Sequence, residues 1–436
     1  MESIRAIRTA TADLNGIARG KRLPGQMGDK LIADGARFPL SVLNLDIWGE
    51  DIENSPLVFD SGDPDGVARP TERGPLPMPW LDTPSALVPM WMYHEDGRVF
   101  EGDPRQALAH LLVRFTERGL FPLVGTELEF HLVDDSAEDI APAASPRSGK
   151  RRTGGDILSL RQLDAFDAFF TDLYDGAEAM GIPAETAISE SGLGQFEINL
   201  GHREALTAAD DAWLFKMLVH GMARKHGFAA SFMAKPWPDQ AGNGMHVHVS
   251  VLNDEGRNAF DDGTEKGSDM LRHAIGGCLA AMPASTLIFA PHGPSYDRFV
   301  PGAHAPTGVG WAYENRTAAL RVPGGAPAAR RLEHRVAGGD ANPYLMIAAV
   351  LGGIINGISD RIAPPAALTG NAYEMDLPQI PQDWHTAIDL FETSPEMARI
   401  FPAGLIANLT ATKRQEARKL AELDATARRD LYLDIV

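Results

Sequence analysis

The sequence predicts an α+β protein in two parts, a small β-rich N-terminal domain over residues 1–103 and a larger domain of strands and helices over residues 104–436. In the first part, short apolar runs alternate with turn signals such as S-G-D-P-D-G at residues 61–66, a pattern typical of strands joined by tight turns. Beyond residue 103, segments with helical periodicity alternate with strand-like apolar runs. A chain of 436 residues, 44% of them hydrophobic, can bury a large core.

The composition disfavours several classes of protein. Asp and Glu outnumber Lys and Arg by 59 to 40, and the net charge of −19 disfavours a nucleic acid or an anionic membrane as a partner. The single cysteine, Cys278, excludes a disulfide framework and fits a reducing cytosol. The N-terminus lacks the apolar segment of a secretory signal, and the apolar run at residues 342–358 is too short to span a bilayer. We therefore expect a cytoplasmic protein.

One acid of the N-terminal part lies in an apolar setting. Asp46 is enclosed by Leu45, Ile47 and Trp48 in the segment N-L-D-I-W-G. A buried carboxylate is costly unless it has a partner. We therefore expect a polar or charged group beside Asp46.

The larger part begins with a predicted helix and an acidic strand. Asp103 is a predicted N-cap, and residues 104–118 begin with proline and continue with helical periodicity. Residues 123–133 read as a strand, L-V-G-T-E-L-E-F-H-L-V, in which a period of two aims Glu127 and Glu129 the same way. Such neighbouring carboxylates are tolerable on a core strand only if a cation such as Mg²⁺ or Mn²⁺ lies between them. The alternative is an edge strand with a solvated polar face.

The alternation of strand and helix then continues. Residues 134–155 are polar, and we expect an exposed loop there, with an active-site lid as the alternative. Helical periodicity follows over residues 160–180. A second acidic strand, S-E-S-G-L-G-Q-F-E-I-N-L, carries Glu190 and Glu197.

A pair of histidines marks the next strand. His246 and His248 alternate with valines in A-G-N-G-M-H-V-H-V-S-V and so share one face. Gly242 and Gly244, just before them, permit close approach of the backbone to another group. Two histidines on one face resemble a pair of metal ligands, although one of the two can also be an ordinary core histidine.

Arginines gather in three short segments further along the chain. The segments are R-F-V-P-G-A-H-A-P, N-R-T-A-A-L-R and R-R-L-E-H-R, and they contain Arg298, Arg316, Arg321, Arg331, Glu333 and Arg335. In the last segment, two arginines and the glutamate alternate onto one strand face. Arginines on a core-like strand imply an anion, either a carboxylate or a phosphate.

Acids and histidines that can bind cations, beside arginines that can bind anions, are what a nucleotide-dependent phosphoryl transfer needs. The sequence has no G-x-x-x-x-G-K-[ST], which argues against a Walker-type NTPase. These motifs resemble the glutamine synthetase family over nearly the whole chain. The motifs that carry the resemblance, in the family's order, are A-D-L-N-G-I-A-R-G-K-R-L-P, T-E-L-E-F, G-Q-F-E-I-N-L, G-N-G-M-H-V-H, N-R-T-A-A-L-R, R-R-L-E-H-R and G-G-D-A-N-P-Y-L.

The resemblance implies a cofactor set and a ligand set. ATP would be a co-substrate, and two or more Mg²⁺ or Mn²⁺ ions would bind in each active site. One metal would be held by Glu129, Glu190 and Glu197, and the second by Glu127, His246 and Glu333.

The resemblance also implies roles for other residues. Glutamate would be bound by Arg298, Arg335, His246 and the Gly242 backbone, and the phosphates and nucleotide by Arg316, Arg321, Arg331 and Ser250. The family first makes γ-glutamyl phosphate, which an amine then attacks. Arg316 and Glu190 would act in catalysis, and Asp46 from a neighbouring subunit would orient or deprotonate the amine.

Three departures from the family pattern bear on the substrate. Ammonia-using members carry a glutamate where this chain has His304, in V-P-G-A-H-A-P, and a tyrosine where Leu158 aligns. Without that anion and that phenol, the pocket is roomier and more apolar, as in the γ-glutamylpolyamine and γ-glutamylalkylamide synthetases of the same family. Ala328 replaces a lysine of the usual ATP site.

We therefore expect an ATP-dependent ligase that joins glutamate to an amine larger than ammonia, such as putrescine, ethanolamine or an alkylamine. The alternatives are an ordinary glutamine synthetase, a catalytically silent family member that serves as a binding or structural assembly, and a metal-dependent amidohydrolase on another fold. The resemblance implies an N-terminal β-grasp domain over residues 1–103 and a catalytic domain with a curved antiparallel sheet over residues 104–436. It also implies a homo-oligomer of stacked hexameric rings, with active sites between subunits.

Overall fold

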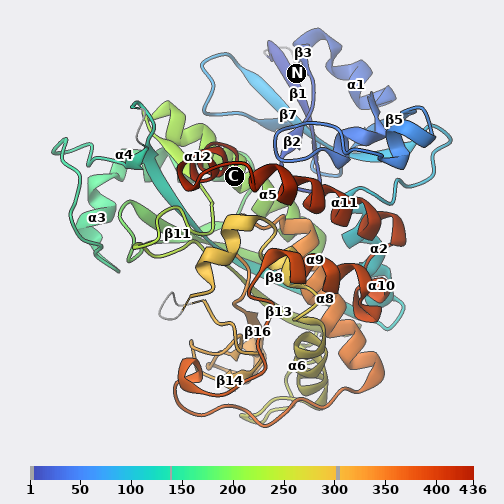
Figure 1. Ribbon diagram of the computed structural model, residues 1–436, viewed down its shortest axis with the longest axis vertical. Coiled ribbons are helices and arrows are strands. Elements are labelled where there is room, and N and C mark those ends of the chain that lie inside the picture. The colour runs from blue at the N-terminus through green and yellow to red at the C-terminus, as the bar shows by residue number, and fades with distance from the viewer. Residues whose placement is uncertain (1–3, 138–139, 301–304) are drawn as a thin grey trace.

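The structure is a computed structural model that describes residues 4–137, 140–300 and 305–436. Within these residues it contains two sheets, a small one near the N-terminus and a larger, curved one at the centre of the molecule (Figure 1). Strands and helices are thus mixed, as predicted. The helices cover the larger sheet and fill the C-terminal third of the chain.

The N-terminal sheet has the order β2-β1-β7-β5-β4. Its strands are β1 (Ala6–Ala12), β2 (Ala18–Arg19), β3 (Arg22–Pro24), β4 (Ala36–Pro39), β5 (Asp65–Pro70), β6 (Leu76–Pro77) and β7 (Ser85–His94), with helix α1 (Gly28–Asp34) between β3 and β4. Ile7 on β1 and Val88 and Met92 on β7 are buried in a hydrophobic cluster that is separate from the main core. The first hundred residues are therefore β-rich, as the turn signals predicted, and the domain boundary at residue 103 stays a prediction.

The central sheet has the order β10-β11-β8-β13-β16-β15-β14. Its strands are β8 (Leu120–Asp134), β9 (Ala141–Pro142), β10 (Ala184–Ser189), β11 (Gln195–Glu204), β12 (Ala229–Ser231), β13 (Met245–Asn253), β14 (Trp311–Tyr313), β15 (Leu320–Val322) and β16 (Leu332–His334). Every pairing is antiparallel except that of β14 with β15. The acidic strand β8 lies between β11 and β13, so the edge-strand alternative for residues 123–133 is wrong.

The helices of the larger part are α2 (Pro104–Thr116), α3 (Leu160–Ala165), α4 (Asp167–Ala179), α5 (Ala205–Lys225), α6 (Asp269–Ala281), α7 (Thr286–Phe289), α8 (Pro343–Asp360), α9 (Trp384–Thr393), α10 (Pro395–Ile400), α11 (Ala403–Leu420) and α12 (Ala425–Ile435). The predicted N-cap of α2 is confirmed, because the Asp103 carboxylate accepts hydrogen bonds from the backbone N–H groups of Arg105 and Gln106. In α8, the one described helix with the length and apolarity to cross a membrane, 83% of the apolar window is buried inside the fold, as the sequence predicted for residues 342–358.

The helix predicted over residues 160–180 is interrupted. It divides into α3 and α4 at Phe166, whose φ of −113° and ψ of 22° are not helical. The Phe166 side chain is buried against Phe196 and Phe228, with ring centroids 5.3 and 5.6 Å away. The break in the helix lets the Phe166 ring enter the core. The helical periodicity of the sequence did not indicate this break.

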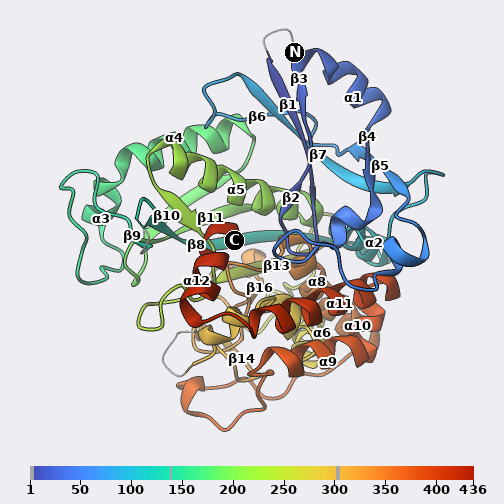
Figure 2. The ribbon, with the colours of Figure 1, turned by 45° about the horizontal axis from the view of Figure 1, so that its top comes forward.

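Helix α11 lies against loops of the N-terminal part, and Figures 1 and 2 show it on the side where that part meets the rest of the fold. The contact is polar and buried. Lys413 donates a hydrogen bond to the Glu416 carboxylate over 2.9 Å, and Asn15 donates to the other oxygen of Glu416 over 2.9 Å. Lys413 also donates to the Asn15 side-chain oxygen, and both Lys413 and Glu416 are fully buried. The bonds of Asn15 to this buried ion pair therefore fix how α11 meets the N-terminal segment.

Candidate functional site

The register of the central sheet brings the predicted acids and histidines together. Glu197 lies opposite Glu129 across β11 and β8, His246 lies opposite Glu127 across β13 and β8, and Glu333 lies opposite His248. Paired residues in antiparallel strands project to the same face. Their side chains therefore converge on one face of the sheet.

Glu127 is at the centre of this group. One carboxylate oxygen lies 2.9 Å from His246 Nδ1, and the other lies 2.9 Å from His248 Nε2. Burial alone would raise the pKa of Glu127, but the hydrogen bonds from the two histidines outweigh it and hold that pKa well below its usual range. Glu127 is therefore a carboxylate at neutral pH.

Glu197 and Glu190 lack such compensation. Burial, with the neighbouring charges of Glu129, Glu127 and Glu190, raises the pKa of Glu197 to about 9. Burial and the charge of Glu129 raise the pKa of Glu190 to about 7. In the described part of the chain, no side chain donates a hydrogen bond to the Glu197 carboxylate. These acids crowd a space that a cation would neutralise.

Two groups of ligand atoms, each within 4.8 Å of one another, suit a metal ion: Glu127, Glu197 and His246 form one, and Glu127, His248 and Glu333 form the other. Carboxylate oxygens with imidazole nitrogens are donors that Mg²⁺ and Mn²⁺ accept. The residues therefore fit divalent ions. The grouping differs from the predicted one, because Glu127 bridges both histidines and so joins the two groups. The sequence left one of the two histidines open as a core histidine, and the resemblance named only His246 as a ligand. The place of His248 on the same strand face as His246 was the signal for its inclusion.

Arginines enclose Glu333 from two sides. Arg321 Nη1 donates to one carboxylate oxygen over 2.8 Å, and Arg335 Nη1 donates to the other. Burial would raise the pKa of Glu333, but Arg335 and the nearby histidines outweigh it and lower that pKa. Arg331 lies one residue before the three-residue strand β16 and Arg335 one residue after it. Arg331 Nε donates to His248 Nδ1 over 3.2 Å.

Arg298 reaches the same region from the 3₁₀ helix η4 (Gly293–Arg298). Its guanidinium is buried, and Nη1 donates to the Val336 carbonyl over 2.7 Å. A Cβ atom at Gly244 would lie 2.7 Å from Arg298 Nη2, and one at Gly242 would lie 2.3 Å from the Ala234 carbonyl oxygen. The two glycines are therefore needed for this arginine and this backbone to approach.

Arg316 is placed differently from the other arginines. It is exposed in the turn between β14 and β15, and it makes no ion pair within the described residues. Its charge still reaches the acidic group, since it lowers the pKa of Glu190 against the raising effect of burial. Arg316 thus stands at the rim of the site with its guanidinium uncommitted.

A cavity of about 680 Å³ opens beside Glu127. Its lining includes His248, Ser250, Arg331 and Ala328. Two of the four residues predicted to bind the phosphates and nucleotide, Ser250 and Arg331, are thus together, whereas Arg316 and Arg321 are not among the lining residues. Ala328 contributes an apolar wall where the predicted family pattern has a lysine.

The sequence profile of the glutamine synthetase catalytic domain matches residues 101–432. The chain belongs to the glutamine synthetase family. It is 40% identical, over 84% of its length and 78% of the relative's, to the gamma-glutamylputrescine synthetase PuuA of Escherichia coli (strain K12). It is also 31% identical, over 95% of its length and 89% of the relative's, to the gamma-glutamylethanolamide synthetase GlnA4 of Streptomyces coelicolor.

Solved structures agree with this family. The chain superposes on a GmaS/ADP complex with a TM-score of 0.85 at 27% identity, over 98% of this chain and 96% of that one. The predicted catalytic fold of the glutamine synthetase family is therefore confirmed, including its curved, largely antiparallel sheet.

Asp46, which the glutamine synthetase resemblance assigned to a neighbouring active site, is bonded within its own chain. One carboxylate oxygen accepts hydrogen bonds from the backbone N–H groups of Trp48 and Glu50, and the other accepts from Gln415 over 2.9 Å and Lys419 over 2.6 Å. The side chain is fully buried. The expected partner exists, but it comes from α11 of the same chain. All of the bonding that the described residues give Asp46 is thus internal, and its role toward an amine of a neighbouring subunit stays a prediction.

Leu158 and His304 were predicted to distinguish this chain from ammonia-using glutamine synthetases. His304 lies outside the described residues. Leu158 is 70% exposed with a φ of 57°, and its backbone N–H donates to the Ser189 carbonyl, one residue before Glu190. Ile157 and Leu160 beside it are also more than half exposed. From the sequence, only Leu158 of these three apolar residues was predicted to contribute to the site.

Proposed function

We propose that the chain is an ATP-dependent ligase that joins the γ-carboxylate of glutamate to an amine larger than ammonia, and that this amine attacks a γ-glutamyl phosphate intermediate. The observation that carries the proposal is the acid and imidazole group of the central sheet, which adjoins a cavity and several arginines in a member of the glutamine synthetase family. The names of the relatives support glutamate and a polyamine or amino alcohol as substrates.

Two or more divalent ions, Mg²⁺ or Mn²⁺, would be held by Glu127, Glu129, Glu190, Glu197, His246, His248 and Glu333. When bound, such ions would balance the charge of the acids and of phosphoryl oxygens. Glu127 keeps its negative charge at neutral pH through its two histidine partners, and this suits a permanent ligand.

Different arginines would bind different anionic groups of the substrates. Arg298 and Arg335, with the Gly242 backbone, would hold the carboxylates of glutamate. Arg316 has an uncommitted guanidinium at the rim of the acidic group, so it would reach the phosphoryl group in transfer, with Arg321 beside it. Ser250 and Arg331 would contact the nucleotide from the cavity wall.

The amine preference is the direct test of the proposed reaction. Phosphate release that depends on ATP and glutamate is expected with putrescine, ethanolamine and short alkylamines, and kcat/KM is expected to rise about fourfold for each added methylene, because burying one contributes about 0.8 kcal/mol. Leu158→Ala should flatten this rise, and His304→Glu should shift preference toward ammonia. Val113→Ala, at an exposed valine on α2, is the control.

An ordinary glutamine synthetase would instead favour ammonia over every larger amine. A silent family member would release no phosphate with any amine. Either result would end the proposed substrate assignment, and the second would also end the proposed ligase activity.

Gly244 offers a separate test of the glutamate site. Gly244→Ala is expected to raise the KM for glutamate about tenfold with a smaller effect on the KM for ATP, because the new methyl group displaces the flexible end of Arg298, and a lost charged contact is worth about 1.5 kcal/mol. Gly154→Ala, where a Cβ would meet nothing within 4 Å, is the matched control. Equal changes in both variants would remove Arg298 from the proposed glutamate site.

The remaining features are proposed from the family. Residues 1–103 would form a β-grasp domain, residues 104–436 the catalytic domain, and the subunits stacked hexameric rings in the cytoplasm. The mass of the native assembly, measured by light scattering, tests the ring arrangement.

A further inference from the structure

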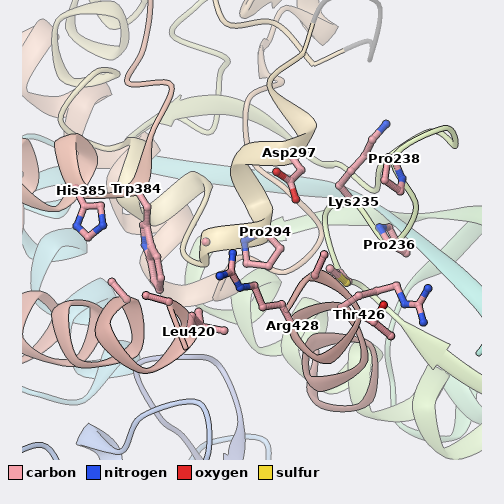
Figure 3. Close-up of a pocket in the computed structure, with 16 residues that line it drawn as sticks. Lys235, Pro236, Pro238, Pro294, Asp297, Trp384, His385, Leu420, Thr426 and Arg428 are labelled. Atoms are coloured by element: carbon pink, nitrogen blue, oxygen red, sulfur yellow. The ribbon is translucent and has the colours of Figure 1, made fainter. Parts of the chain in front are cut away.

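A second cavity of about 680 Å³ lies away from the acidic group, at the C-terminal end of the fold (Figure 3). Four separate segments enclose it: residues 233–238, the 3₁₀ helix η4, the start of α9, and the junction of α11 with α12. None of the proposed metal ligands or arginines of the first site lines it. Its size is within the range of pockets that hold small organic ligands.

The apolar part of the wall is flat. Trp384 contributes an indole that is 7% exposed, and Pro236, Pro238 and Pro294 contribute rings that cannot change shape. Leu420 closes the side formed by α11. Such walls suit a planar or short aliphatic body.

The polar part of the wall is positively charged in a protein whose net charge is −19. Lys235, Arg428 and Arg429 line the cavity against a single acid, Asp297. Arg429 is paired with Asp430 at 2.7 Å. In the described chain, neither Lys235 nor Arg428 has a carboxylate within 4.0 Å, so two cations are left uncommitted to any acid.

Two donors in this wall are also without partners. The indole Nε1 of Trp384 and the Nε of Arg428 are buried and donate to no atom of the described residues. A buried N–H group without an acceptor is costly. Neither nitrogen is accessible from the cavity, so an acceptor-rich group bound there would pair with the two cations that line it.

We propose that this cavity is a second ligand site, for a small molecule that carries a phosphate or carboxylate group on a flat apolar body. The anion would pair with Arg428, in a cavity that Lys235 makes more positive, and the body would lie against Trp384 and the prolines. Arg428 would contribute most, because its planar guanidinium can bond two oxygens at once.

The cavity is connected to the proposed glutamate site. Asp297 precedes Arg298 on η4, and Lys235 donates to the Gln240 carbonyl, two residues before Gly242. A ligand that engages Lys235 or η4 would therefore alter how Arg298 and Gly242 are held. This coupling, which rests on the proposed function, is expected to change the affinity for glutamate severalfold, within the usual range for linked sites.

The test is titration of the intact protein with phenyl phosphate, benzoate and inorganic phosphate by calorimetry, with Mg²⁺ and ADP present to fill the proposed nucleotide cavity. Phenyl phosphate or benzoate should bind with one saturable site, and inorganic phosphate should bind at least tenfold more weakly because it lacks the apolar body. The stronger of the two aromatic probes identifies whether phosphate or carboxylate is the natural group.

Arg428→Gln should weaken the better probe at least tenfold, whereas Arg429→Gln, on the same helix but already paired, should change it less than twofold. No saturable binding by the wild type, or equal loss in both variants, would overturn the site. If no probe binds and Arg428→Gln instead lowers the mass of the native assembly, the cavity is a contact between copies. Binding without any change in glutamate affinity would overturn the coupling and leave the site.

Discussion

Replacing Glu127 by glutamine is expected to lower the turnover of the amine ligase about a thousandfold or more. The carboxylate belongs to both groups of candidate metal ligands and receives hydrogen bonds from both His246 and His248. The neutral amide keeps the shape of the side chain but removes the charge that both groups share. Loss of that charge is expected to cost about 4 kcal/mol of transition-state stabilisation. Steady-state phosphate release with saturating glutamate, ATP and amine measures the change.

Glu185→Gln is the matched control for this variant, because Glu185 is an exposed acid that lines the same cavity. Binding of Mn²⁺, followed by electron paramagnetic resonance, separates loss of metal from loss of chemistry. Glu127→Gln should weaken Mn²⁺ binding while Glu185→Gln leaves it unchanged. A Glu127→Gln enzyme with near-normal turnover and metal binding would remove this residue from the site.

Much of the site could be predicted from the sequence because it depends on local periodicity. Glu127 and Glu129, like His246 and His248, lie two residues apart on strands, and a period of two alone puts each pair on one face. The strands themselves were recognisable from their apolar residues. What local periodicity does not contain is the register between strands, and that register joins His246 to Glu127 and Glu333 to His248. The predicted grouping of the ligands therefore did not include His248, and which residues hold which metal stays a prediction.

Other features depended on contacts distant in the chain. The need of Asp46 for a partner was predicted correctly, but the partners Gln415 and Lys419 lie on a helix more than 360 residues later. The break at Phe166 depends on a pocket formed by Phe196 and Phe228. The residues around Asp46 and Phe166 in the sequence do not indicate which distant residues contact these two side chains.

The stability that protonated Glu190 and Glu197 contribute to the metal-free protein is expected to be lost as the pH rises from about 5 to 9. Glu190 and Glu197 have folded-state pKa values of about 7 and about 9, above their ordinary value of 4.5, because burial and neighbouring acids disfavour their charged forms. At these two groups the folded state therefore holds more protons than the unfolded state, so their contribution to the free energy of unfolding falls as the pH increases. The loss from the two acids is expected to be several kcal/mol, because a tenfold change in proton affinity is worth about 1.4 kcal/mol. Urea unfolding in EDTA at a series of pH values measures it.

Divalent metal and a neutral side chain should each reverse this loss, for different reasons. Saturating Mg²⁺ or Mn²⁺ favours the charged carboxylates, so the pH dependence should flatten and the free energy of unfolding should rise most at pH 9. Glu197→Gln removes the most strongly perturbed acid, so the variant should be more stable than the wild type without metal and should gain less from adding it. Asp13, Asp103 and Asp211, whose pKa values are raised to about 6 by burial, titrate in both proteins and cancel in the comparison. If Glu197→Gln instead destabilises the metal-free protein at pH 9, the Glu197 carboxylate accepts a stabilising hydrogen bond in the fold. The group of acids is then not a preformed cation site.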